Sequence, residues 1–128
     1  LTVVTPIGLD HQKFLGNTIE EIATTKLNSI EKKAIMGFQP FNKVYNMAKD
    51  IAERKSTTIF LLKDVKYDNR VLSITKSLNW SHYLYENALL AIEALKIIPL
   101  SFNIEDLKTV KIFGRIYSIA PNIIIDVG

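Results

Sequence analysis

The first 26 residues constrain the fold of this 128-residue chain more than any other part of it. An apolar run from Leu1 to Thr5 is broken by proline and glycine and is followed by Asp10-His11, the order typical of a buried strand that ends in a loop. Further on, Thr18 and Glu21 have the spacing of a capping box, in which their side chains satisfy the first backbone amides of a helix. The stretch therefore predicts a strand, a loop that places an imidazole at the end of a sheet, and a helix.

Alternating strand and helix patterns continue as far as residue 62. Lys33–Phe38 and Ser56–Leu62 are apolar or β-branched segments of strand length. Between them, Asn42 can cap a helix that runs to about Lys55. This order of strand, helix, strand, helix and strand predicts the α/β fold class.

The segment from Lys63 to Asn79 has a different pattern. An alternating pattern on either side of Asp68-Asn69-Arg70 predicts a hairpin or a small antiparallel sheet; its members are Val65, Tyr67, Val71, Ser73 and Thr75. The next segment, Ser81 to Ile98, has the strongest helical pattern and ends before Pro99. The face of this helix that we expect to be buried consists of Leu84, Ala88, Ala91 and Leu95.

The last part of the chain predicts a short helix and two strands. Asn103 can cap the short helix. The strands are Ile116–Ala120 and Ile123–Val127, and a Pro121-Asn122 turn joins them.

Lys26 lies on the apolar stripe of the first helix, seven residues after Ile19. A buried ammonium is costly unless it is paired, neutralised or chemically altered. One interpretation is that the helix ends here and the long lysine stem reaches solvent. The other is that the amine binds an anion or forms a carbamate, which is a carboxylate-like metal ligand. His11 has the same two interpretations, a hydrogen-bonded structural residue or a metal ligand.

The first motif resembles a known family. Its parts, in chain order, are Ile7-Gly8-Leu9-Asp10-His11, Leu15-Gly16, Thr18-Ile19-Glu20 and Lys26, which lies fifteen residues after His11. Together they resemble the signature of folylpolyglutamate synthases and bifunctional dihydrofolate synthases of the Mur-ligase superfamily. The resemblance implies that His11 is a Mg²⁺ ligand. It also implies that Lys26 is carbamylated, is part of the catalytic centre and helps to hold a second metal ion.

Three further residues stand where the resembling family binds ATP. An asparagine inside a helix most often faces solvent or bonds a neighbour, but its amide also matches the donor and acceptor of an adenine edge. The resemblance implies that Asn87, in Asn87-Ala88, contacts adenine. It implies that Arg115 contacts the ATP phosphates, for which a guanidinium suits well, and that Asp126 binds the ribose.

Composition restricts the other function classes. The net charge of +3 comes from dispersed lysines with acidic residues among them, so no basic stripe for nucleic acid is present. No apolar run approaches the roughly 18 to 20 residues that would span a bilayer. The sequence contains no cysteine, which excludes thiolate sites and fits a reducing cytoplasm.

The resemblance also implies a domain division and a reaction. Residues 1–112 correspond to the second half of a central ATP-binding domain, and residues 113–128 to the start of a C-terminal ligase domain, so we expect a piece of a longer protein. In the parent enzyme, ATP and Mg²⁺ activate a folate or dihydropteroate carboxylate as an acyl phosphate, which L-glutamate then attacks. No Gly-x-x-x-x-Gly-Lys-Ser/Thr loop occurs in the sequence, so the isolated chain is predicted to be inactive.

Two alternatives stay open from the sequence. The chain could derive from a Mur peptidoglycan-precursor ligase, although Leu15-Gly16-Asn17-Thr18-Ile19-Glu20 favours the folate branch. It could also be a non-catalytic interaction module. In each case unpaired sheet edges would seek partners, so we expect a dimer or strand exchange through them.

Overall fold

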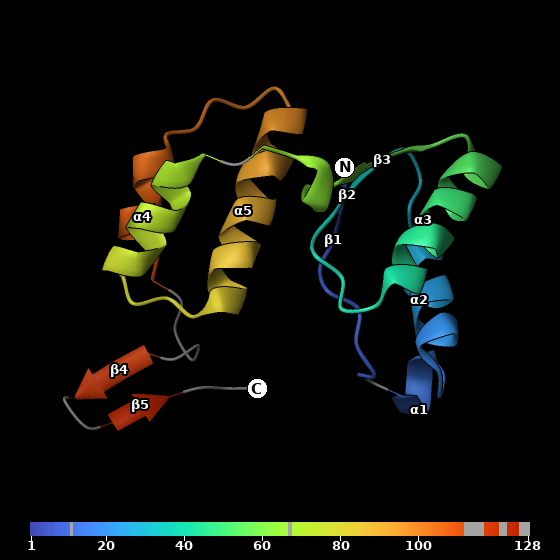
Figure 1. Ribbon diagram of the computed structural model, residues 1–128, viewed down its shortest axis with the longest axis horizontal. Helices are drawn as coiled ribbons and strands as arrows, with labels where there is room; N and C mark the ends of the chain where they lie inside the picture. The colour runs from blue at the N-terminus through green and yellow to red at the C-terminus, as the bar shows by residue number, and fades with distance from the viewer. Residues whose placement is uncertain (11, 67, 112–116, 121–122, 126–128) are drawn as a thin grey trace.

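A three-stranded parallel sheet lies at the centre of the chain. The computed structural model describes residues 1–10, 12–66, 68–111, 117–120 and 123–125. The strands are β1 (Thr2–Val4), β2 (Lys33–Met36) and β3 (Thr58–Leu61), in the order β1-β2-β3. Val3 pairs with Ile35, and Ile35 pairs with Phe60 on its other side. The predicted α/β fold class is therefore confirmed (Figure 1).

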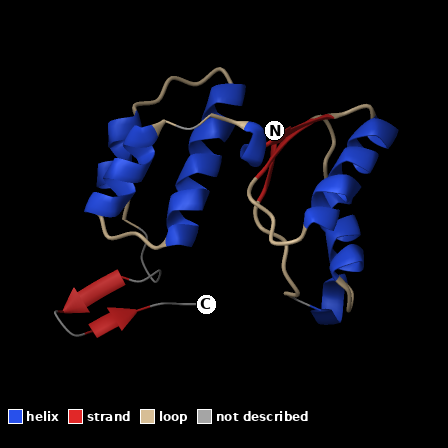
Figure 2. Cartoon of the chain, in the orientation of Figure 1, coloured by secondary structure: helices blue, strands red, loops and turns tan. Residues whose placement is uncertain are grey.

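Helices cover both faces of the sheet (Figure 2). One side carries α1 (Gln12–Leu15), α2 (Ile19–Asn28) and α3 (Asn42–Lys55). The other carries α5 (His82–Ile97), with α4 (Asn69–Ser77) and the 3-10 turns η1 (Leu62–Asp64) and η2 (Ile104–Thr109). Successive side chains of β2 alternate between the two cores, because Ala34 and Met36 pack with α2 and α3, whereas Ile35 packs with α5. A strand buried on both faces is apolar throughout, as this one is beyond its first residue.

The capping box at the start of α2 is confirmed. The Thr18 hydroxyl accepts a hydrogen bond from the Glu21 amide at 3.2 Å. The Glu21 carboxylate accepts from the amides of Asn17, at 2.7 Å, and Thr18, at 3.3 Å. These bonds fix where the helix begins, directly after the loop that follows β1. In the first turn of the same helix, a hydrogen bond from Lys43 of α3 lowers the pKa of the exposed Glu20.

The predicted burial of Lys26 holds only in part. The buried residues of α2 are Ile19, Ile22, Ala23 and Leu27. Leu27 is fully buried, whereas Lys26 beside it is half-buried. Lys26 lies in the last turn of the helix, where a long stem can cover apolar surface and still leave the core at the helix end.

The predicted hairpin between Lys63 and Asn79 is wrong, because this segment forms η1 and then helix α4. Asp68 caps α4 by accepting a hydrogen bond from the Arg70 amide at 2.9 Å. Side-chain hydrogen bonds from the Arg70 guanidinium also lower the pKa of Asp68. The buried residues Val71, Ile74 and Thr75 have helical spacing, and the alternation of Val71 and Thr75 misled the strand prediction.

The helix predicted over Ser81 to Ile98 is confirmed as α5, but its predicted buried face is partly wrong. Leu84 and Ala88 are buried as expected, whereas Ala91 is exposed and Leu95 is half-buried. The helix is apolar over most of its circumference and lies between the sheet and α4, so a single four-residue stripe underestimates its buried surface. The further buried residues are Leu89, Leu90, Ile92, Glu93 and Ala94.

The last described segments are two antiparallel strands, β4 (Tyr117–Ala120) and β5 (Ile123–Ile125). They correspond to the two strands predicted near the end of the chain. The Pro121-Asn122 turn lies outside the described residues, as does the predicted boundary at residues 112 and 113, so the domain division stays a prediction. Among the described helices, none has both the length and the apolar character that crossing a bilayer requires.

Candidate nucleotide-binding site

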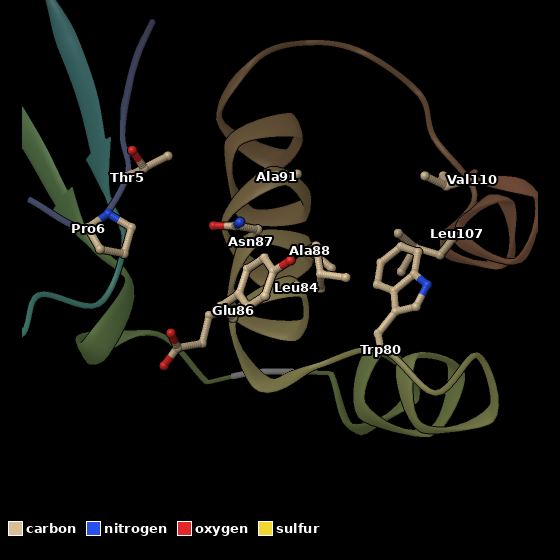
Figure 3. A pocket seen from close by; sticks show the side chains of 11 residues that line it. Thr5, Pro6, Trp80, Leu84, Glu86, Asn87, Ala88, Ala91, Leu107 and Val110 are labelled. Atoms are coloured by element: carbon tan, nitrogen blue, oxygen red, sulfur yellow. The ribbon is translucent and has the colours of Figure 1, made fainter. Parts of the chain in front are cut away.

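A cavity of about 600 Å³ lies between the loop after β1 and one side of α5 (Figure 3). Thr5 and Pro6 form its wall on the sheet side. Trp80, just before α5, and Leu107 and Val110, at the end of η2, line its far side. The residues that α5 contributes are Tyr83, Leu84, Glu86, Asn87, Ala88 and Ala91.

The topology explains why the cavity lies here. Thr5 and Pro6 directly follow β1, so they stand at the carboxyl ends of the parallel strands. Ligands of open α/β sheets bind at that edge. On α5, Tyr83, Asn87 and Ala91 are spaced four residues apart and therefore share one side of the helix. The Asn87 amide extends from this side toward the loop of Thr5 and Pro6 (Figure 3).

The cavity wall is mainly apolar and aromatic, with few polar groups. Asn87 offers two donors and one acceptor. The Glu86 carboxylate lies 3.2 Å from the His82 imidazole, one helical turn away. No lysine or arginine of the described residues lines the cavity. Such a wall suits a planar, uncharged heterocycle, and any attached phosphates would need cations from elsewhere.

The chain is similar to proteins of known sequence and known structure. No known family model matches the chain. A protein described as "Probable dihydrofolate synthetase" from Schizosaccharomyces pombe is 29% identical over 117 residues, which cover 81% of this chain and 28% of that protein. The crystal structure of Helicobacter pylori folylpolyglutamate synthetase superimposes with a TM-score of 0.72 at 25% identity, covering 98% of this chain and 32% of that one. This chain shares the fold of folylpolyglutamate synthetases. The structure of a mutant of L. casei FPGS superimposes with a TM-score of 0.74 at 17% identity, and the match covers 97% of this chain and 37% of the FPGS chain.

This chain spans about a third of the length of these relatives. The resemblance stated from the Ile7–His11 motif is confirmed by the similarity to the two enzymes. The sequence resemblance and the structural likeness therefore point to the same family of ligases.

The five predicted site residues fall into three groups. Asn87 is exposed and lies on the cavity wall. Lys26 is half-buried on α2, on the opposite side of the sheet from α5, and it does not line the cavity. His11, Arg115 and Asp126 lie outside the described residues, so their roles stay predictions.

Of the two predicted metal ligands, only Lys26 lies among the described residues. Its ammonium makes no ion pair with any carboxylate of the described part of the chain, and a carbamate on it would supply the oxygen ligands that Mg²⁺ prefers. Within residues 1–10, 12–66 and 68–111, no three histidine, aspartate, glutamate or cysteine side chains gather as a metal site. The predicted metal-binding roles of His11 and Lys26 therefore stay predictions.

The sequence analysis missed two aromatic residues of the cavity. Tyr83 stands one helical turn before Asn87, so the four-residue spacing could have identified it. Trp80 precedes the helix and reaches the cavity only because the chain turns between α4 and α5. No local sequence signal indicated that position.

Proposed function

We propose that this chain is part of an ATP-dependent ligase that adds L-glutamate to folate, with dihydropteroate as a second candidate acceptor. The observation that carries the proposal is the cavity at the carboxyl end of β1, with Asn87 on its wall, in a fold shared with folylpolyglutamate synthetases. One of the solved structures of this fold is an FPGS–AMPPCP complex, with a TM-score of 0.72. The proposed compartment is the cytoplasm, which suits a sequence without cysteine.

In this proposal, the chain's residues bind and orient the nucleotide. Asn87 donates to and accepts from the adenine edge, and the apolar wall excludes water from the base. Asp126 binds the ribose, and Arg115 supplies the cation that the cavity wall lacks. The γ-phosphoryl group then passes to the acceptor carboxylate, and the glutamate amine displaces phosphate from the acyl phosphate to form the amide.

Mg²⁺ is the proposed metal. His11 and Lys26, the latter as a carbamate, are the proposed ligands. Held by these residues, Mg²⁺ would supply charge neutralisation for the phosphates.

Asn87→Ala is expected to weaken adenosine binding to the full 128-residue chain by about tenfold, because it removes both hydrogen bonds to the base edge. Chemical-shift titration with adenosine and guanosine measures the effect, and the unaltered chain should prefer adenosine. Asn46→Ala, which removes an exposed amide on α3, is the matched control and should leave the affinity unchanged. Equal affinities for the two nucleosides would contradict the role of Asn87.

The isolated chain is expected to show no Mg²⁺-dependent ATP hydrolysis and no folylglutamate synthesis, because its sequence contains no P-loop motif to cradle the phosphates. A phosphate-release assay with a metal-free blank measures this, and turnover above the blank would contradict it.

Growth of a folate-ligase-deficient strain that carries the full-length gene would separate a folate ligase from a Mur peptidoglycan ligase. A P-loop encoded directly upstream would argue against a non-catalytic interaction module.

We also propose that β1 is the edge through which two copies of the chain associate. Leu1 and Val3 are 45% and 47% exposed, and together with α5 they line an apolar hollow of about 440 Å³. No charged residue of β1 protects this edge, so two copies can meet there without repulsion.

Val3→Lys is expected to convert a dimer to a monomer, as measured by light scattering. Phe60→Lys, on the opposite edge strand β3, should not do so, and a chain that is monomeric without substitution would refute the association.

A further inference from the structure

One glutamine side chain joins the loops that follow β1 and β2. The Gln39 amide oxygen accepts a hydrogen bond from the Ile7 amide at 2.9 Å. Its amide nitrogen donates to the carbonyl oxygens of Thr5, at 3.3 Å, and Gly37, at 3.1 Å. Both donor and acceptor groups of this half-buried side chain are therefore used on the backbone.

The same network reaches the end of the third strand. The Gln39 backbone amide donates to the Tyr45 hydroxyl of α3 at 2.8 Å. Tyr45 is only 5% exposed, and the Lys63 ammonium, in the turn after β3, lies 4.2 Å from the centre of its ring. The carboxyl ends of β1, β2 and β3 are thus linked through Gln39 and Tyr45.

The first of these loops depends on Gln39 for its shape. Ile7 is 1% exposed, so its amide would be left unsatisfied in the interior without the Gln39 oxygen. Thr5, whose carbonyl accepts from Gln39, also lines the candidate cavity together with Pro6. The Ile7 side chain packs in the core, but the loop lies outside regular secondary structure, so no helix or strand ladder holds its backbone.

We infer that Gln39 is a positioning residue, which holds the Thr5–Ile7 backbone against the second loop so that Thr5 and Pro6 form the cavity wall opposite α5. This inference rests on the proposed function only in assigning a nucleoside to the cavity. The bonding pattern requires an amide, because the substitution Gln39→Glu would retain an acceptor for Ile7 but would place a second carboxylate oxygen against two carbonyl oxygens.

Two substitutions test the inference on the full chain. Gln39→Met keeps the length of the side chain and removes all three side-chain hydrogen bonds, and Gln39→Glu removes only the donors. Asn46→Asp, an exposed amide-to-acid change on α3, is the matched control. The readouts are amide hydrogen exchange, resolved by residue, and the dissociation constant for adenosine.

We expect Gln39→Met to speed exchange of the Ile7 amide by about tenfold, while core amides such as that of Ile35 change much less. We expect the adenosine dissociation constant to rise about threefold to tenfold in both Gln39 variants and to stay unchanged in the control. Unchanged exchange at Ile7, or equal acceleration at every core amide, would overturn the positioning role. Faster exchange of the Ile7 amide with unaltered adenosine affinity would overturn the positioning role as well. If the unaltered chain binds no adenosine, the proposed function fails, and exchange at Ile7 still decides whether Gln39 holds the loop.

Discussion

Leu27→Ala is expected to lower the free energy of unfolding by about 2–5 kcal/mol, the range for truncating a fully buried leucine. Leu27 is 0% exposed and belongs to the core between the sheet and helices α2 and α3. Truncation removes apolar contacts and leaves a cavity that the surrounding helix and sheet cannot fill. Urea unfolding followed by circular dichroism measures the loss, read from the midpoint at constant slope.

Lys26→Ala is the control for this measurement. Lys26 is the residue before Leu27 in α2, and the helical pattern of the sequence predicted that it would be buried. The half-buried lysine loses only part of its stem packing, so its truncation should cost about 1 kcal/mol or less. Equal losses for the two variants would show that Lys26 contributes to the core as much as Leu27 does, contrary to the structure.

Gly16→Ala is expected to cost about 1–3 kcal/mol, the range for backbone held in a region that L side chains rarely adopt. Gly16 has a φ of 120°, and a Cβ atom built on it would lie 2.4 Å from the Glu21 Cβ and 2.7 Å from a Glu21 carboxylate oxygen. Glu21 is the acidic residue of the capping box, so the added methyl group would also displace the carboxylate from the Asn17 and Thr18 amides. Thermal or urea unfolding measures the stability, and amide exchange at Asn17 and Thr18 reports on the cap.

Gly8→Ala is the matched control, because Gly8 lies in the preceding loop without these constraints. A Cβ atom there would meet its nearest neighbour, an Asp10 carboxylate oxygen, at 3.4 Å, which is ordinary van der Waals contact. Its substitution should change the unfolding free energy by less than about 1 kcal/mol. A Gly16 variant as stable as the Gly8 variant would show that the loop can relax around Glu21.

Local signals were sufficient to predict most of the sheet and its flanking helices. The capping box at Thr18 and Glu21 marks the start of α2, and the run from Lys33 marks β2, because both depend on neighbouring residues alone. The segment that forms α4 was mistaken for strands, because Val71 and Thr75 fit either period. Asp68 was interpreted as part of a turn, although it acts as a helix cap.

The candidate site was less predictable than the fold. Asn87 could be identified from its helical position and the resemblance, and Tyr83 from the same spacing. Gln39 could not, because its partner Ile7 is 32 residues away and no periodic pattern relates the two. Trp80 and Leu107 come together at the cavity only through the packing of α4, α5 and η2, which depends on tertiary structure.

The parallel pairing of β1 also determines when this part of the molecule can form. Thr2 pairs with Ala34, so β1 is synthesised well before its partner strand. Gln39 follows β2 by only a few residues, and the loop that it holds is therefore expected to dock in the same event as β1. During biosynthesis, this wall of the cavity can become ordered only once residue 39 is available, and α5, which forms the opposite wall, is synthesised later still.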